Sequence, residues 1–332
     1  MLRSAARWLI RTVGLLGFLA GGMAGSWFAV DRLIVQAEGP HDDTVLIRIA
    51  PGDGHATIRW ALKRGGVIRD LYHYDAARIM AGTSFVPKEG EFEIPPRANL
   101  AAIMDIIHAG RSHQRRLTVI EGLTSVEISA AILRNENFSG EITLDLEEGS
   151  LLPETYFFTH GTSRDAMLRR MQEKRELALA EAWIDRAPDL PYASPRDALI
   201  LASIIELETG DSAERREVAG VFVNRLKRGM RLQSDPTVLY GVEGDTKRTI
   251  RRSDLKRKTE WNTYVIKGLP KTPICNPSLE SINAALAPAQ TKNLYFVSDG
   301  KGGLRFARTL DEHNRNVRLF RQAQRKAGLR DN

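Results

Sequence analysis

The first strong pattern along the chain is an uninterrupted apolar run near its N-terminus. Residues Thr12 to Val30 read TVGLLGFLAGGMAGSWFAV and carry no charge. A helix that crosses a bilayer needs about 20 such residues, so the run predicts one transmembrane helix. Arginines precede it and Asp31 and Arg32 follow it, so the positive-inside rule leaves the tail in the cytoplasm and the bulk of the chain outside. The alternative is a cleaved signal peptide, whose apolar core is usually shorter.

Beyond this run, short alternating strands precede amphipathic helices. The segments Val45 to Leu62 and Arg115 to Ile132 both read as a strand, a glycine turn and a helix, with matching positions 70 residues apart. Gly90 to Gly110 repeats the pattern between them. Because neither of the two matching segments can bury its apolar face alone, we expect them to pack on a small shared sheet. Chance similarity of two ordinary segments is the alternative.

The second half of the chain is more helical. A charged stretch from Ser163 to about Arg186 has the spacing of an exposed helix. At Ser194 the residues SPRD supply an N-cap and a proline at the first helical position, and the helix they begin ends at Gly210. Apolar residues cover most of its circumference, which is typical of a core helix. Near the C-terminus, GKGG between two apolar segments predicts a hairpin turn.

Two acids lie at the end of this core helix. Glu206 falls on a narrow strip with Ala202 and Ser203, which leaves room beside its carboxylate, whereas Glu208 projects from the opposite side. A carboxylate in apolar surroundings loses hydration, so its pKa rises and it can act as a general acid near neutral pH. The alternative is an ion pair with an arginine of the next helix. The pattern alone leaves both open.

Charge and composition limit the other functions. The net charge of +7 favours an anionic partner. The densest basic cluster, Lys247 to Lys258, contains Asp254 and no aromatic residue, which favours a solvated surface over a nucleic-acid site. Cys275 is the only cysteine, so no intramolecular disulfide forms, and we expect a small buried side chain rather than a nucleophile. Histidine spacing indicates no metal site, and no phosphate-binding loop is present, so we expect no cofactor.

Several long motifs, in order, resemble one known family. The segments ASIIELETG, ERREVAGVFVNRLKRGMRLQSDPTVLYG, WNTYVIKGLPKTPICNPS and NLYFVSDGKGG look like those of the MltG or YceG-like endolytic murein transglycosylases. The resemblance implies a single-pass inner-membrane protein with a LysM-like subdomain and a periplasmic catalytic domain. Such an enzyme cuts new peptidoglycan strands, leaves 1,6-anhydro-N-acetylmuramic ends, and works beside peptidoglycan synthases. The family's catalytic acid, the first acid of ASI-x-E-x-E-T, falls on Glu206.

The same motifs supply candidate substrate contacts in loops rich in hydroxyl and amide groups. These candidates are Gln233, Asp235, Asn262 and Tyr264. Leu207 and the pair Cys275 and Asn276 depart from the family pattern, which bears on fine specificity.

The expected fold is α+β and has three parts. Residues 1–36 form the tail and anchor, 37–160 a LysM-like α+β subdomain, and 161–332 a mixed α/β catalytic domain. The alternative function is a non-catalytic peptidoglycan-binding scaffold in which Glu206 is only an ion-pair partner.

Overall fold

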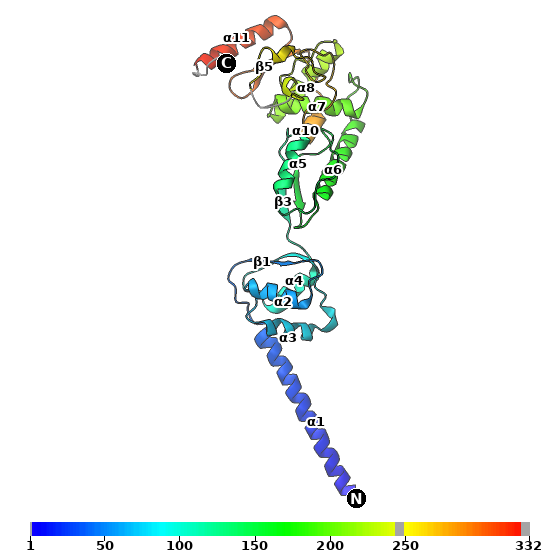
Figure 1. The fold of residues 1–332 in the computed structure, drawn as a ribbon, viewed down its shortest axis with the longest axis vertical. Coiled ribbons are helices and arrows are strands. Elements are labelled where there is room, and N and C mark those ends of the chain that lie inside the picture. The colour runs from blue at the N-terminus through cyan, green and yellow to red at the C-terminus, as the bar shows by residue number, and fades with distance from the viewer. Residues whose placement is uncertain (1, 243–248, 327–332) are drawn as a thin grey trace. The chain divides into compact units, whose positions relative to one another are not determined.

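The structure, a computed structural model, describes residues 2–242 and 249–326 (Figure 1). Lys247 and Arg248 of the basic cluster therefore lie outside the described residues. The chain divides into two compact units. Unit 1 contains residues up to 115 together with 157–160, and unit 2 contains 116–156 and the chain from 161 onward. The expected α+β composition is confirmed, and the LysM-like character of the first unit stays a prediction.

Unit 1 begins with the long helix α1 (Leu2–Val30), which continues into one π-helical turn, Asp31–Val35. Among the described residues, the stretch Thr12–Val35 is the one helix long and apolar enough to cross a membrane. No residue of its most apolar part is buried, with Phe18 80% exposed, whereas Val35 at its end is 7% exposed. Length and composition therefore agree with the predicted membrane helix, and a signal sequence near the N-terminus would meet the same criteria.

The rest of unit 1 packs small helices on a two-stranded sheet. Strand β1 pairs antiparallel with β2, and Val45 lies opposite Ile94. Buried Ile47, Phe92 and Ile58 form part of one apolar core. The elements are β1 (Val45–Ile49), α2 (His55–Arg64), α3 (Leu71–Ala81), a 3-10 turn (Gly82–Ser84), β2 (Gly90–Ile94) and α4 (Leu100–Ala109).

The predicted strand–turn–helix segments form, but the shared sheet is wrong. The second segment folds as β3 (Arg115–Thr118) and α5 (Ser125–Arg134), and β3 pairs with β4 (Thr155–Phe158) rather than with β1. Strand β1 already has a partner, because β2 presents buried apolar residues in register with it. Similar patterns thus build two separate sheets, since periodicity fixes which face is apolar and leaves the choice of partner open.

Unit 2 is built around the central helix α7 (Pro195–Glu208). Helices α8 (Ser212–Lys227) and α10 (Leu279–Leu286) pack against it in one apolar core (Figure 1). Cys275 is buried beside it, as predicted, with its thiol near the Ser203 carbonyl. The remaining elements are α6 (Arg164–Ile184), α9 (Pro236–Leu239), a 3-10 turn (Asp254–Lys256), the antiparallel pair β5 (Tyr295–Ser298) and β6 (Leu304–Ala307), and α11 (Leu310–Lys326).

Candidate active site

Helix α7 carries both candidate acids at its C-terminal end. The Ser194 hydroxyl accepts a hydrogen bond from the Asp197 amide at 3.2 Å and caps the helix, as the SPRD motif predicts. Every residue from Ala198 to Glu206 is buried, so surrounding elements hold the end of the helix in place. The fold of unit 2 therefore determines the surroundings of the two acids.

Glu206 is enclosed, contrary to the accessible position predicted from the helical wheel. It is 9% exposed, and its carboxylate has a partner on each oxygen. The Arg215 guanidinium donates to Oε1 at 3.1 Å, and the Ser278 backbone amide donates to Oε2 at 2.7 Å. The Ser278 hydroxyl donates to the same oxygen. Because Ser278 caps α10, the carboxylate also sits at the positive end of that helix.

The segment before Ser278 is held by a buried polar network. Asn276 is fully buried, and its side-chain oxygen accepts from the Leu151 amide at 2.9 Å. Its side-chain nitrogen donates to the Leu123 carbonyl at 3.0 Å and to Glu148 at 3.2 Å. The Gly122 amide in turn donates to the Asn276 carbonyl at 3.1 Å. Three distant stretches thus meet beside Glu206, which explains why a helical wheel cannot foresee its enclosure.

Glu208 lines an open cavity of about 530 Å³. The Ser234 hydroxyl donates to its carboxylate at 2.5 Å. Burial, opposed by the Ser234 hydrogen bond and Arg225 and aided by nearby Asp235, raises the pKa of Glu208 to about 7. Glu208 can therefore hold a proton near neutral pH in the wall of a cavity.

The cavity gathers residues from distant parts of unit 2. Its lining comes from α7, α8, the 232–235 loop, the 264 loop, the β5–β6 hairpin and α11. The lining residues are Glu208, Arg225, Leu232, Gln233, Asp235, Tyr264, Tyr295, Phe296, Val297, Ser298, Leu304, Leu310 and His313.

Three of the four predicted substrate contacts meet in this cavity. Gln233, Asp235 and Tyr264 all line it. The Tyr264 hydroxyl donates to Asp235 at 2.6 Å, which joins the two loops. Gln233 adopts a left-handed backbone with φ of 52°, and its amide donates to the Thr263 carbonyl at 3.2 Å. The two polar loops therefore form one surface next to Glu208.

Asn262 does not lie in the cavity wall. It is fully buried, and its side-chain nitrogen donates to the carbonyls of Asp254 and Arg257 at 3.1 and 2.8 Å. Its side-chain oxygen accepts from the Tyr264 amide at 3.0 Å. These bonds order the loop that presents Tyr264.

Arg225 is a cavity residue that sequence reasoning missed. It is 8% exposed, and its guanidinium donates to the carbonyls of Leu294 and Leu232, both at 2.6 Å. The guanidinium lies over the Tyr295 ring, 5.1 Å from its centroid, and His313 stacks on that ring at 5.2 Å between centroids. The fixed cation faces the cavity, and burial lowers the pKa of His313, which keeps this imidazole neutral.

Across residues 2–242 and 249–326, no three His, Cys, Asp or Glu side chains gather as they would around a metal ion.

Comparison with known proteins places these features in a family. The model of the YceG-like family matches residues 47–319. An endolytic murein transglycosylase of Bacillus subtilis is 30% identical over 325 residues, covering 88% of this chain and 89% of that protein. The chain belongs to the YceG-like family. An endolytic murein transglycosylase of Streptococcus pneumoniae is 31% identical over 183 residues, or 51% of this chain and 31% of that protein.

One solved structure is also similar. A YceG-like protein of Listeria monocytogenes is 28% identical, with a TM-score of 0.49, and the match covers 82% of this chain and 99% of that one.

The YceG-like match contains the whole cavity, from Glu208 to His313. Its acidic centre and polar loops lie in the motifs that carried the resemblance. In this YceG-like chain, Arg225, Tyr295 and His313 were missed because each reads as an ordinary helix or strand residue. Arg225 lies in the segment VNRLK and His313 in the segment HNRNV, so the sequence contains both residues in recognisable motifs. Neither motif shows which side of its helix faces a cavity.

Proposed function

We propose that this chain is a membrane-anchored endolytic lytic transglycosylase that cuts peptidoglycan glycan strands, with Glu208 as its catalytic acid. The observation that carries the proposal is a carboxyl group with a pKa of about 7 in the wall of an open, polar cavity. Relatives that bear the name endolytic murein transglycosylase support the reaction class.

The reaction needs one group that first gives and then takes a proton. Protonated Glu208 donates its proton to the glycosidic oxygen while the bond from C1 of N-acetylmuramic acid to that oxygen breaks. The leaving sugar departs with a new hydroxyl, and the muramic ring carries oxocarbenium-like positive charge. The Glu208 carboxylate then takes the proton from the C6 hydroxyl as its oxygen bonds to C1. The product is a 1,6-anhydro ring, water is not consumed, and Glu208 ends protonated.

The environment of Glu208 suits both halves of this cycle. Burial favours the neutral acid at the start, and the Ser234 hydroxyl, which donates to the carboxylate, stabilises the anion formed midway. Arg225 adds a fixed positive charge near the anion. Gln233, Asp235 and Tyr264 offer amide, carboxylate and hydroxyl groups for sugar binding, and Asn262 orders the loop.

Glu206 is the competing candidate, because the family pattern pointed to it. Its carboxylate is already paired with Arg215 and with both donors of Ser278. Its side chain is only 4% exposed, so the carboxylate has little access to a ligand. We therefore assign Glu206 a structural role, in which it joins α7, α8 and α10.

The anchor follows from α1. Its apolar stretch is long enough to cross a bilayer, and the arginines before it favour a cytoplasmic N-terminus and an outer catalytic unit. The expected association with peptidoglycan synthases stays a prediction.

The test uses the full chain in detergent with uncrosslinked peptidoglycan strands, read by mass spectrometry. Wild type, Glu208→Gln and Glu206→Gln are compared, and thermal unfolding is measured for each. Glu208→Gln should lower turnover by about 10²-fold or more, because the proton donor is lost, while its melting temperature stays at or above that of wild type. Glu206→Gln should mainly lower the melting temperature.

The chemical structure at the ends of the cleaved strands identifies the reaction class. Internal fragments with anhydro ends support the transglycosylase. Reducing ends would mean hydrolysis, with Asp235 as the second carboxylate that such an enzyme needs. Bound but uncut strands would indicate the scaffold. Loss of turnover in folded Glu206→Gln, with an active Glu208→Gln, would overturn the assignment of the acid.

A further inference from the structure

Helix α3 in unit 1 has two apolar faces. One face carries Tyr74 and Ala77, which are 0% and 2% exposed and belong to the core of unit 1. The other carries Tyr72, Ala76 and Ile79 at helical spacing. Tyr72 is 79% exposed and Ile79 is 63% exposed. A helix on the surface of a water-soluble domain normally presents polar residues there, so this second face calls for a partner.

The second face of α3 borders α1. A wedge-shaped hollow of about 630 Å³ lies between the two helices. On the α1 side its residues recur every three or four positions along one stripe, and the only hydroxyl in the lining belongs to Ser26. The lining consists of Phe18, Leu19, Gly22, Met23, Ser26, Trp27, Val30, Ala76, Ile79 and Met80. Such a surface offers almost no groups for binding a sugar and suits a hydrocarbon partner.

The position of α3 beside the end of α1 is fixed by packing. The turn Asp31–Val35 contacts α3, and Val35 is 7% exposed within the core of unit 1. Helix α1 runs directly into this turn. The buried Val35 therefore holds α3 beside the C-terminal end of the apolar stretch.

The length of the apolar stretch determines where its C-terminal end lies in a bilayer. The 24 residues of Thr12–Val35 span roughly 36 Å as a helix, at about 1.5 Å per residue. The hydrocarbon core of a bilayer is about 30 Å thick. With this anchor in a bilayer, the Asp31–Val35 turn lies in the headgroup layer. Trp27 and Phe28 then lie where aromatic residues favour the membrane interface.

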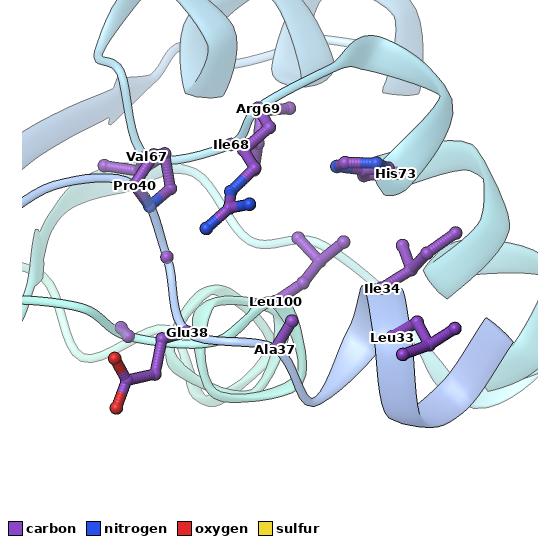
Figure 2. Close-up of a pocket in the computed structure, with 12 residues that line it drawn as sticks. Leu33, Ile34, Ala37, Glu38, Pro40, Val67, Ile68, Arg69, His73 and Leu100 are labelled. Atoms are coloured by element: carbon purple, nitrogen blue, oxygen red, sulfur yellow. The ribbon is translucent and has the colours of Figure 1, made fainter. Parts of the chain in front are cut away.

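A second, smaller cavity lies beside the C-terminal end of the apolar stretch. It measures about 210 Å³ and is lined in part by Leu33 and Ile34 from the end of the apolar stretch. Figure 2 shows the Arg69 guanidinium directed into this cavity, with Glu38 at its edge. Both residues are exposed. Opposite charges at this depth suit the phosphate and ammonium groups of a zwitterionic phospholipid headgroup.

We propose that the Tyr72–Ala76–Ile79 face of α3 rests in the outer-leaflet interface, with phospholipid acyl chains filling the wedge between α3 and α1. The proposal rests on the proposed membrane anchoring of α1. It predicts direct contact between lipid and Ile79, a residue outside the transmembrane helix. Unit 1 is then bound to the membrane by a surface as well as by a tether, as amphipathic interfacial helices are.

The test places a nitroxide label at single cysteines in the full chain. Native Cys275 does not compete for the label, because it is buried. Ile79→Cys reports the α3 face and Phe18→Cys reports the transmembrane helix. Leu46→Cys, a residue 42% exposed in β1, is the matched control. Strand β1 lies at the end of unit 1 away from α1 (Figure 1). Each protein is placed in vesicles of phosphatidylethanolamine and phosphatidylglycerol, and collisions with oxygen and with a water-soluble nickel chelate are measured.

We expect the oxygen-to-nickel collision ratio at position 79 to exceed that at position 46 about tenfold or more. Equal ratios at 79 and 46, with a lipid-like label at 18, would overturn the proposal and leave the anchor intact. A water-like label at 18 would show that α1 is not inserted, which refutes the anchor and the α3 proposal together. A label at 79 shielded from both reagents would mean a protein partner, such as a second copy, and would also overturn it.

Discussion

At the scale of single residues, the end of α7 holds two acids with different surroundings. Glu206 is paired with Arg215 and Ser278, whereas Glu208 keeps one hydroxyl partner and a pKa of about 7. Glu208 also lines the open cavity. Under the proposed assignment, the same residue type joins three helices at one position and carries the proton two positions later.

The pH dependence of activity follows from the protonation of Glu208. The first step needs the neutral acid, so kcat/KM should be level below the pKa and fall about tenfold per pH unit above a pH of about 7. Circular dichroism across the same range separates this loss from unfolding. A profile that rises through pH 7 would indicate a catalytic base instead, and would contradict the proposed first step.

The buried ion pair predicts a large loss of stability when Arg215 is removed. Arg215→Met leaves the Glu206 carboxylate buried without its cation, and we expect a loss of about 3 kcal/mol or more in unfolding free energy. Combining it with Glu206→Gln should recover part of that loss, because no buried charge then remains. Urea unfolding of both variants measures this. Losses that simply add would mean that the two side chains do not interact.

The sequence predicted several residues that belong to the candidate site. It could not predict which neighbours surround each of them. The sequence located both acids, the helix that bears them and three residues of the cavity. The choice between Glu206 and Glu208 depended on Ser278, Arg215 and Ser234, which come from other elements. A helical wheel contains none of these neighbours, so it misjudged which acid is accessible.

At the scale of elements, α8 approaches the chain after α10 closely through Gly220. A Cβ atom at Gly220 would lie 2.7 Å from both the Ala289 carbonyl oxygen and the Thr291 methyl group. Gly210 has open space at the same position and a normal backbone. The two glycines therefore form a matched pair for testing this contact.

Gly220→Ala should destabilise unit 2 although alanine favours helices. The clash with backbone should cost about 1 to 3 kcal/mol, more than the gain in helix propensity of about 1 kcal/mol. Gly210→Ala should be neutral or slightly stabilising, because it restricts the unfolded chain. Chemical denaturation of both variants tests this, and a stabilised Gly220→Ala would show that α8 can move away freely.

Element positions were more predictable than element pairing. The core helix, its Ser194 N-cap and the β5–β6 hairpin follow from local spacing and turn residues, and all are present. The helix ends at Glu208 with Thr209 as its C-cap, two residues before the glycine at which it was predicted to end. The shared sheet failed because strand pairing depends on which apolar edges meet, and β2 was the better partner for β1. Local patterns specify an element and leave its neighbour undetermined.

At the scale of the whole molecule, the apolar stretch overlaps the packed core of unit 1. The boundary expected after residue 36 stays a prediction, and Val35, just before it, is buried in that core while its turn packs on α3. The packed core of unit 1 therefore begins within the apolar stretch. Length and hydropathy could not show this, because Val35 reads like any other residue of that stretch.

A soluble fragment that begins at residue 37 should be less stable than one that begins at residue 31. Loss of buried Val35 alone should lower the unfolding free energy by about 2 kcal/mol. The matched control is Val35→Ala in the longer fragment, which should reproduce most of the loss. Equal stability of the two fragments would mean that the Asp31–Val35 turn contributes nothing to unit 1.

The composition of the cavity wall sets the order in which the enzyme matures. Glu208 precedes Tyr295, Leu310 and His313 in the chain, and these three come from its last described elements. With the proposed N-terminal anchor, the acid reaches the outside before these residues do. The cavity around the proposed acid is then complete only after α11 has followed.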